Sequence, residues 1–341
     1  MTKLKVLVTG AGGYIGTTLC QELISAGYEV TALDRFYFGV NQLDKLVHHN
    51  ALSIVRKDIR DITAFDLQGH YAVIDLAAIS NDPAGDLDPN LTREVNELGR
   101  IHVACKAKEA EVSRYILSSS CSVYGGNEEE CIETTAPNPL SIYAQSAHQA
   151  ELGILKLGDT AFTTYAFRNG TVHGLSSRMR FDLVVNAMTL SAFQKGKILI
   201  LGDGEQWRPL VHVVDLAKSF VASLSLPVDA MQGQIFNIAT ENLKVATVAY
   251  KIKESLGRTL TIEFVDQDHD KRDYRVSSEK ARRIGLITSS YSIEQSSHEV
   301  YQALSNGTIA QTEKTSTVGW YKRIIEAEKI VNEIKLNGRI L

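Results

Sequence analysis

Short apolar runs alternate with helical patterns through the first half of the chain. The runs are almost continuously apolar, as strands are when helices cover both faces of a parallel sheet. We predict six such strands: LKVLVTG (4–10), EVTALD (29–34), LSIVRKD (52–58), YAVIDLAA (71–78), RYILSSS (114–120) and AFTTYAFR (161–168). Helical patterns at about 14–26, 90–110 and 141–158 separate them. This alternation predicts an α/β fold with a Rossmann-type, doubly wound parallel sheet.

Beyond residue 170 the pattern becomes mixed. A helix over 181–195 and a terminal helix over 318–335 are predicted, together with strands KILILGD, RPLVHVVD (running into a helix), QIFNIA and TLTIEFVD. We see no internal repeat, low-complexity segment or linker. We therefore expect a Rossmann domain over 1–170. A smaller mixed α/β lobe over 171–341 should pack on it, with some chain crossing back to the first sheet.

Composition and charge narrow the class of protein. The 341 residues are 44% hydrophobic and carry a net charge of −4, typical of a globular protein that can bury a core without disulfides. The mild acidity argues against nucleic-acid and membrane-surface partners, and no run approaches the ~18 apolar residues that span a bilayer. The N-terminus lacks signal-peptide features, and the four cysteines lack CxxC spacing. We expect a cytoplasmic protein with no metal site.

The first predicted strand runs into the segment TGAGGYIG, which carries Gly10, Gly13 and Gly16 at the turn into a helix. Glycine permits the tight turn and lets the backbone approach a pyrophosphate, which the helix N-terminus then attracts. The second strand ends in Asp34, where a carboxylate would bind the adenosine ribose and repel the 2′-phosphate of NADP. This favours NAD, although Arg35 can weaken the preference. Asp58, which ends the third strand, is either an adenine contact or a turn cap.

Two further segments suggest the chemistry. Ser118, Ser119, Ser120 and Ser122 follow the fifth strand at the sheet edge where ligands bind, and Tyr143 begins a helical pattern in NPLSIYAQSAHQAE. Together with TGAGGYIG, the DLAA at 75–78, Asn96 and WRPLVHVVD, these segments resemble the extended short-chain dehydrogenase/reductase family of nucleotide-sugar epimerases, dehydratases and decarboxylases. FRNGTVHGLSSRMRFDLVVN further resembles a branch that acts at C4 of nucleotide sugars.

The resemblance implies that Tyr143 is the general base, that Ser120 assists it and that hydride passes to NAD. The family carries a lysine four residues after the tyrosine, which lowers the phenol pKa and binds the nicotinamide ribose. Here that position is Ala147, and His148 points about 100° away around the helix. Three explanations stand: an engineered Lys→Ala substitution, a natural variant with altered chemistry, or a binding protein that has lost activity. We expect slow turnover with NAD binding largely kept.

The resemblance also limits the reaction. Family 4,6-dehydratases have an Asp–Glu pair where this chain has Cys121 and Ser122, so dehydration is not expected. Transient oxidation at C4 needs only the serine, the tyrosine and NAD. We therefore expect C4 epimerisation of a nucleoside-diphosphate sugar through a 4-keto species. The alternatives are a dehydrogenase or ketoreductase that releases or accepts the keto sugar, and a catalytically silent protein that binds the sugar nucleotide and NAD.

Further contacts follow by position in the family. The remaining predicted cofactor contacts are Tyr14, Ile15, Ile59, Leu76, Ala77, Ala78, Asn96, Ser118 and Tyr143. The predicted substrate contacts are Ser80, Ser120, Ser122, Asn169, Arg178, Arg180, Asn186, Arg208 and Arg272, with guanidinium groups suited to a diphosphate. By the same analogy, the helices at 90–110 and 141–158 pair across a two-fold axis in a homodimer.

Overall fold

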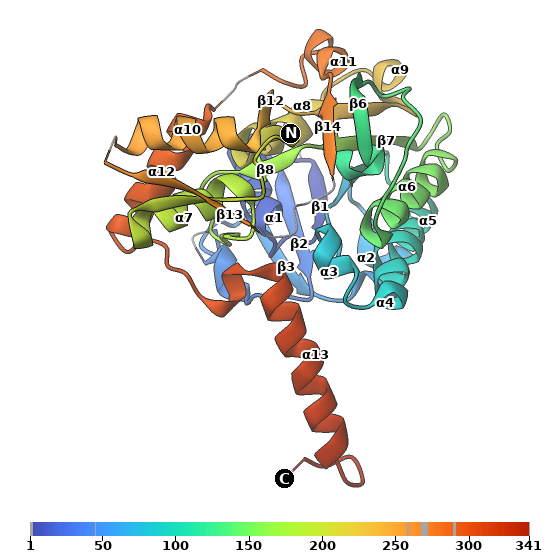
Figure 1. Ribbon diagram of the computed structural model, residues 1–341. Helices are drawn as coiled ribbons and strands as arrows, with labels where there is room; N and C mark the ends of the chain where they lie inside the picture. The colour runs from blue at the N-terminus through green and yellow to red at the C-terminus, as the bar shows by residue number, and fades with distance from the viewer. Residues whose placement is uncertain (1–2, 45, 258, 267–271, 289–290, 341) are drawn as a thin grey trace.

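The computed structural model describes residues 3–44, 46–257, 259–266, 272–288 and 291–340. A seven-stranded parallel sheet lies at its centre (Figure 1), in the order β11-β7-β5-β4-β1-β2-β3. The strands are β1 (Lys5–Thr9), β2 (Glu29–Asp34), β3 (Leu52–Arg56), β4 (Ala72–Asp75), β5 (Arg114–Ser120), β7 (Thr163–Asn169) and β11 (Ile235–Ile238). The predicted fold class is confirmed. The strand order reverses between β1 and β4, which is where such sheets bind ligands at their carboxyl edge.

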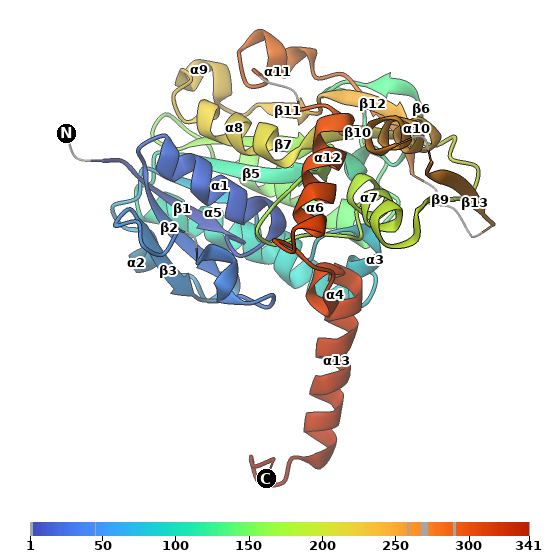
Figure 2. The same cartoon turned by 90° about the vertical axis from the view of Figure 1, so that its left-hand side faces the viewer.

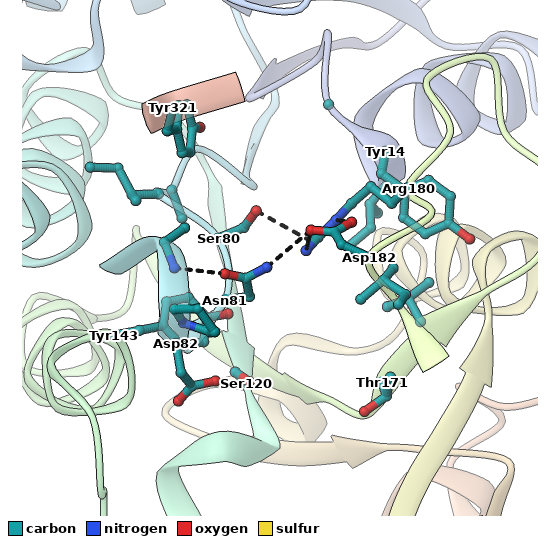
Figure 3. A pocket seen from close by; sticks show the side chains of 18 of the residues that line it. Tyr14, Ser80, Asn81, Asp82, Ser120, Tyr143, Thr171, Arg180, Asp182 and Tyr321 are labelled. Carbon is teal, nitrogen blue, oxygen red and sulfur yellow. Dashed lines mark hydrogen bonds and ion pairs between the residues drawn. The ribbon is translucent and has the colours of Figure 1, made fainter. Parts of the chain in front are cut away.

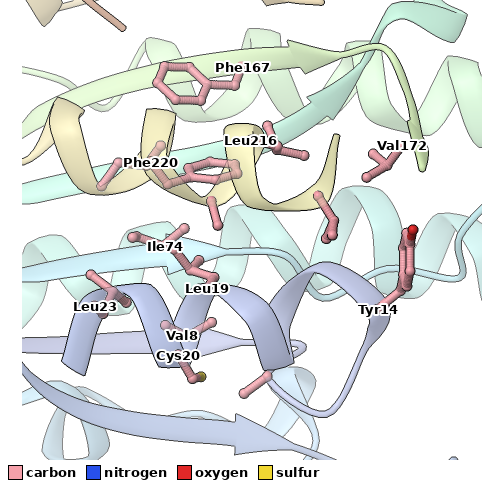
Figure 4. Packing of buried hydrophobic residues seen from close by; sticks show 14 of the residues in the cluster. Val8, Tyr14, Leu19, Cys20, Leu23, Ile74, Phe167, Val172, Leu216 and Phe220 are labelled. Carbon is pink, nitrogen blue, oxygen red and sulfur yellow. The ribbon is translucent and has the colours of Figure 1, made fainter. Parts of the chain in front are cut away.

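Helices cover both faces of this sheet, as the apolar strands require. On one face, α1 (Tyr14–Ser25) packs against α8 (Val213–Ser223), burying Leu19, Leu216 and Phe220 above the strands (Figure 4). On the other face lie α5 (Arg100–Glu109) and α6 (Ile142–Leu155). Within β1, Val6 and Val8 enter the first cluster and Leu7 enters the second, as the two-residue period of a strand dictates.

Short elements fill the connections of the first half. They are η1 (Val40–Leu43), η2 (Ile59–Asp61), α2 (Ala64–Leu67), α3 (Asp82–Gly85), α4 (Pro89–Arg93), η3 (Glu94–Gly99) and η4 (Cys121–Tyr124). The helix expected at 90–110 is present, but η3 makes it widen into a π-helical turn between α4 and α5. Such turns concentrate at functional sites. This one carries the buried Asn96.

Three small sheets lie outside the large one, and all their strands except β6 come from the second half of the chain. The strands are β6 (Gly126–Cys131), β8 (Thr171–His173), β9 (Lys197–Leu201), β10 (Trp207–His212), β12 (Glu241–Lys244), β13 (Thr261–Val265) and β14 (Asp273–Val276). The helices are α7 (Val184–Lys195), α9 (Val228–Met231), α10 (Val245–Leu256), α11 (Glu279–Arg283), α12 (Ile293–Ser305), η5 (Glu313–Thr315) and α13 (Thr317–Ile334). Because β11 pairs with β7, the chain crosses back into the large sheet after residue 230.

The last helix stands apart from this arrangement. The first turns of α13 touch the body, while its C-terminal turns project from it in both views (Figures 1 and 2). Among the described residues, no helix is long and apolar enough to cross a membrane.

Candidate active site

One cleft of about 1340 Å³ runs along the carboxyl edge of the large sheet. Its lining includes Gly10 and Asp34 at one end, Ser120 and Tyr143 in the middle, and Arg208 on the far wall. Sites for one small ligand usually enclose about 300–1000 Å³. The cleft is therefore large enough for a dinucleotide and a second ligand together.

The glycine loop has the shape that a dinucleotide requires. Gly10 has a φ of +66°, and a Cβ there would come within 2.8 Å of the backbone at Leu76 and Ala77. A Cβ on Gly16 would come within 2.3 Å of the Gly10 carbonyl oxygen. The N-cap of α1, Gly13, offers no side chain to the first N–H groups of the helix. The loop thus leaves these donors for phosphate oxygens, so the residues present fit a dinucleotide.

Two carboxylates follow β2 and β3 beside this loop. Asp34 accepts hydrogen bonds from the N–H groups of Gly12 (3.0 Å) and Phe36 (2.5 Å). Burial raises its pKa, and these two bonds oppose the rise. Asp58 caps η2 through the N–H of Arg60, one of the two roles considered from the sequence, and it also lines the cleft. Arg35 forms an ion pair with Asp58 at 2.9 Å rather than with Asp34.

The predicted catalytic pair meets in the middle of the cleft. Ser120 ends β5, and Tyr143 lies in the first turn of α6 behind the N-cap Ser141. Burial raises the pKa of the Tyr143 hydroxyl, the nearby Asp82 carboxylate raises it further, and a hydrogen bond with Ser120 acts in the opposite direction. Two turns along α6, the buried Glu151 accepts from Ser119 (2.5 Å) and pairs with Arg168 (2.7 Å). These bonds fix α6 against β5 and β7.

No lysine charge reaches Tyr143 from the next turn of α6. Ala147 is buried there, with an exposed fraction of 3%, and belongs to an apolar cluster with Cys121, Tyr124 and Tyr274. The cations that lower the pKa of Tyr143 are Arg100 and Arg180. Each is already paired, Arg100 with Asp75 (2.9 Å) and Arg180 with Asp182 (2.9 Å). Their effect is therefore smaller than that of an unpaired lysine one turn away.

Cys121 and Ser122, at the positions of the dehydratase Asp–Glu pair, differ in their surroundings. Burial raises the pKa of Cys121, whose Sγ donates to the Arg168 carbonyl oxygen at 3.1 Å. This thiol is protonated and packed, so it lacks the properties of a reactive cysteine. Ser122 lines the cleft, and its hydroxyl accepts from Ser120 at 3.1 Å.

A polar network that the sequence did not reveal crosses the cleft (Figure 3). Arg180 donates to the Ser80 hydroxyl (3.3 Å), and Asn81 donates to Asp182 (3.2 Å). Asp82 accepts from Ser141 and pairs with Arg272. The sequence analysis named Ser80 from this loop but not Asn81 or Asp82, whose one signal is their place soon after β4, at the ligand-binding edge of the sheet.

Most predicted contacts line the cleft. They are Tyr14, Ile15, Ile59, Leu76, Ala77, Ala78, Ser80, Ser118, Ser122, Asn169, Arg178, Arg180, Arg208 and Arg272. Arg208 donates to the Arg272 carbonyl oxygen at 2.5 Å, which brings these two residues together on one wall. Asn169 donates to Ser118 at 2.8 Å, and its buried Oδ1 has no hydrogen-bond partner among the described residues. That oxygen is available to a ligand donor.

Two predicted ligand contacts, Asn96 and Asn186, lie outside the lining of the cleft. Asn96 is buried and bonds both the N–H and the carbonyl of Ile79, which holds the loop after β4. Asn186 is buried, accepts from Gly174 (3.0 Å) and donates to Tyr14 (3.1 Å). Neither lines the cleft, because these amides are bonded to the protein itself. Among the described residues, no group of three or more His, Cys, Asp or Glu could hold a metal ion.

Known proteins are similar to this chain in sequence. The uncharacterised UDP-glucose epimerase YtcB of Bacillus subtilis (strain 168) is 27% identical over 278 residues, which are 77% of this chain and 86% of that protein. UDP-glucuronic acid decarboxylase 1 of Xenopus tropicalis is 24% identical over 78% of this chain and 63% of its own length.

Solved structures are similar over nearly the whole chain. MoeE5 in complex with UDP-glucose and NAD is 25% identical, with a TM-score of 0.76 over 89% of this chain and 100% of that one. A UDP-N-acetylglucosamine 4-epimerase from Methanobrevibacter ruminantium M1, 23% identical, shares the fold with a TM-score of 0.80 over 90% of this chain and 100% of its own. The family model of the NAD dependent epimerase/dehydratase family matches residues 6–239. The chain therefore belongs to this family, and its cofactor is NAD.

Proposed function

We propose that the chain binds NAD and a nucleoside-diphosphate sugar in the cleft along the carboxyl edge of the large sheet and catalyses slow, reversible oxidation at C4 of the sugar. The observation that carries this proposal is the placement of Ser120 and Tyr143, which line the same cleft as the glycine loop and lie close enough for Ser120 to lower the pKa of Tyr143. NAD, when bound, serves as hydride acceptor and donor. Re-reduction of the 4-keto sugar on its other face gives the C4 epimer.

The chain's own groups move the proton. Tyr143 takes the proton of the C4 hydroxyl, and Ser120 orients that hydroxyl by a hydrogen bond. Since burial raises the pKa of Tyr143 and no lysine opposes it, the phenolate is a minor form at neutral pH. The oxidation is therefore slow, while NAD binding depends on other residues.

The raised pKa of Tyr143 also favours a second candidate function. A protonated phenol is the form that donates a proton to a ketone oxygen as hydride arrives at the carbon. Reduction of an externally supplied 4-keto sugar therefore uses the major form of Tyr143, whereas oxidation uses the minor form. The second candidate is accordingly a nucleotide-sugar ketoreductase.

The substrate class rests on the wall opposite the glycine loop. Arg208 and Arg272 line it together, and planar guanidinium groups suit diphosphate oxygens. MoeE5, the structural neighbour with 25% identity, binds UDP-glucose. UDP-sugars are therefore the first substrates to test.

A C4-deuterated UDP-sugar separates the candidate reactions. The purified chain is incubated with NAD and labelled UDP-glucose or UDP-glucuronic acid, and products are followed by mass spectrometry and NMR. A C4 epimer that retains deuterium supports the epimerase. Free keto sugar with deuterated NADH supports a dehydrogenase, and turnover only from keto sugar and NADH supports the ketoreductase. Binding without any hydride transfer, even in an Ala147→Lys variant, would leave a silent binding protein.

We also propose that the active unit is a homodimer. The surface of η3 and α6 carries two exposed leucines, Leu98 (59% exposed) and Leu152 (43% exposed). Pairing these helices across a two-fold axis would bury both. Sedimentation should give a dimer at micromolar concentration, and Leu152→Glu should give a monomer. A monomeric unmodified chain would refute this assembly.

A further inference from the structure

The first turns of α13 are fastened to the loop that follows β2. Trp320 donates through Nε1 to the Tyr37 carbonyl oxygen at 2.8 Å. The Tyr321 ring packs edge-on to Tyr37 and tilted against Phe38, with ring centroids 6.1 and 5.7 Å apart. This loop begins directly after Asp34, the carboxylate placed to bind the adenosine ribose. The helix is thus anchored at the adenosine end of the cleft.

The same turns are bonded to the opposite side of the cleft. The Thr317 hydroxyl accepts from Arg178 at 2.9 Å, and the Thr317 N–H donates to Asp182 at 3.3 Å. Residues of α13 also contact α3, which follows β4. The helix therefore spans the cleft mouth between the β2 loop on one side and the Arg178–Asp182 segment and α3 on the other.

One face of α13 forms part of the cleft wall. Tyr321, Ile324, Ile325 and Glu328 line the cavity that also contains Gly10. Figure 3 places the Tyr321 side chain on its helix at the edge of this cavity. Burial raises the pKa of Tyr321 to about 12, with Arg178 lowering it and Asp34 raising it. The hydroxyl is therefore protonated and lies within electrostatic reach of the ribose-binding carboxylate.

Arg178, beneath the helix, has an unsatisfied donor. The side chain is 4% exposed, its guanidinium lies 3.7 Å from the Phe38 ring centroid, and it lines the cleft. Its Nε is buried without a hydrogen-bond partner in the part of the chain that the structure describes. The nearby Asp182 is already paired with Arg180. A buried cation placed this way is stabilised by an anion, and a phosphate entering the cleft supplies one.

We propose that α13 is a clasp over the ribose–phosphate part of the bound dinucleotide. Tyr321 covers it from outside, and Arg178, held by Thr317 and Phe38, binds one of its phosphates. This inference rests on the proposed NAD site and adds a kinetic property to it. NAD leaves only after the first turns of α13 lift, so it stays bound between turnovers. A cofactor that stays bound suits an epimerase, because the hydride returns to the same sugar. It suits a dehydrogenase less, because that reaction must release NADH in each cycle.

The test measures NAD release from the 341-residue chain. In Tyr321→Ala we expect the NAD dissociation rate to rise roughly tenfold, the change that about 1.4 kcal/mol of lost contact produces. Ile334→Ala is the matched control, because Ile334 lies on the same helix, is 54% exposed and does not line the cleft. It should leave the rate unchanged. Tyr321→Phe should also keep a slow rate, since the ring provides the cover.

A second variant identifies which ligand supplies the phosphate. Arg178→Met should weaken NAD binding by a larger factor than it weakens UDP binding, which would move Arg178 from the predicted substrate contacts to the cofactor contacts. The reverse selectivity would overturn the proposal and assign Arg178 and α13 to the sugar nucleotide. If the unmodified chain binds NAD but Tyr321→Ala releases it no faster than Ile334→Ala, then the proposed role of α13 in slowing NAD release is wrong, while the proposed function stands. If the unmodified chain binds no NAD at all, the proposed function fails as well. Thermal unfolding of each variant checks that the fold is kept.

Discussion

The two ends of the cleft differ in how completely they contain the residues expected for this family. At the cofactor end, Gly10, Gly16 and Asp34 provide a close backbone turn and a carboxylate in the arrangement a dinucleotide needs. At the catalytic end, Ser120 and Tyr143 are in contact, but Ala147 leaves the phenol without its activating charge. In the proposed function, most of the NAD contacts and the residues that transfer the proton are therefore different groups in one cavity.

The difference has a physical basis. The cofactor end works through backbone N–H groups and the absence of side chains, so many residues share the task. In the proposed function the catalytic end depends on the pKa of one phenol, that of Tyr143, which a single neighbouring charge can move by one to three units. Losing that one charge can therefore slow the chemistry by orders of magnitude while the binding site remains intact.

The largest expected effect is a gain of activity in Ala147→Lys. A positioned general base contributes roughly 10²–10⁴ in rate, so turnover of a UDP-sugar should rise by about that range while the NAD dissociation constant changes little. Ala147→Met is the matched control, because it fills the same apolar cluster with a chain of similar length and no charge. Equal rates in the two variants would mean that charge at position 147 is not what limits Tyr143.

Gly16→Ala tests the cofactor end in the opposite direction. Its Cβ would meet the Gly10 carbonyl oxygen at 2.3 Å, a backbone atom that cannot rotate away. Overpacking of this kind costs about 1–3 kcal/mol, so NAD affinity should fall roughly 10–100-fold by titration calorimetry. Gly126→Ala, where a Cβ meets nothing within 4 Å, should bind NAD normally. Unchanged NAD affinity in Gly16→Ala would mean that the glycine loop does not form the NAD site.

A smaller effect is expected from Asp34→Asn. The amide keeps an acceptor oxygen but loses the charge, so NAD binding should weaken roughly tenfold, and the preference for NAD over NADP should narrow. Asp61→Asn is the control, since Asp61 is exposed and does not line the cleft. Calorimetric titration with both cofactors measures the ratio. An unaltered ratio would indicate that Asp34 does not contact the ribose.

The large sheet was predictable because its strands are buried on both faces and its helices alternate with them. The small strands were not: β6, with the sequence GNEEEC, is mostly exposed and polar, and it forms because β14 pairs with it. No local sequence pattern indicates that β6 will pair with a strand about 150 residues later in the chain. The same limit explains why β8 and β12, each three or four residues long, went unpredicted.

The site was predictable where a motif fixes the backbone, as at Gly10–Gly16, and where a residue ends a strand, as at Asp34 and Ser120. Family position was a weaker guide for Asn96 and Asn186, whose amides are bonded to the protein. It also could not reveal that Arg178 is bonded to Thr317 of α13, because that contact joins segments 139 residues apart.

The pH dependence of C4 oxidation reports on the protonation state of Tyr143. Oxidation needs the phenolate of Tyr143, and burial raises the pKa of that group above its ordinary value near ~10. In the chain as it stands, the rate at saturating NAD and UDP-sugar should therefore rise about tenfold per pH unit through neutrality, without levelling below pH ~10. In Ala147→Lys the plateau should begin at a lower pH. A plateau already reached at neutral pH with Ala147 in place would mean that a phenol of raised pKa does not limit the oxidation.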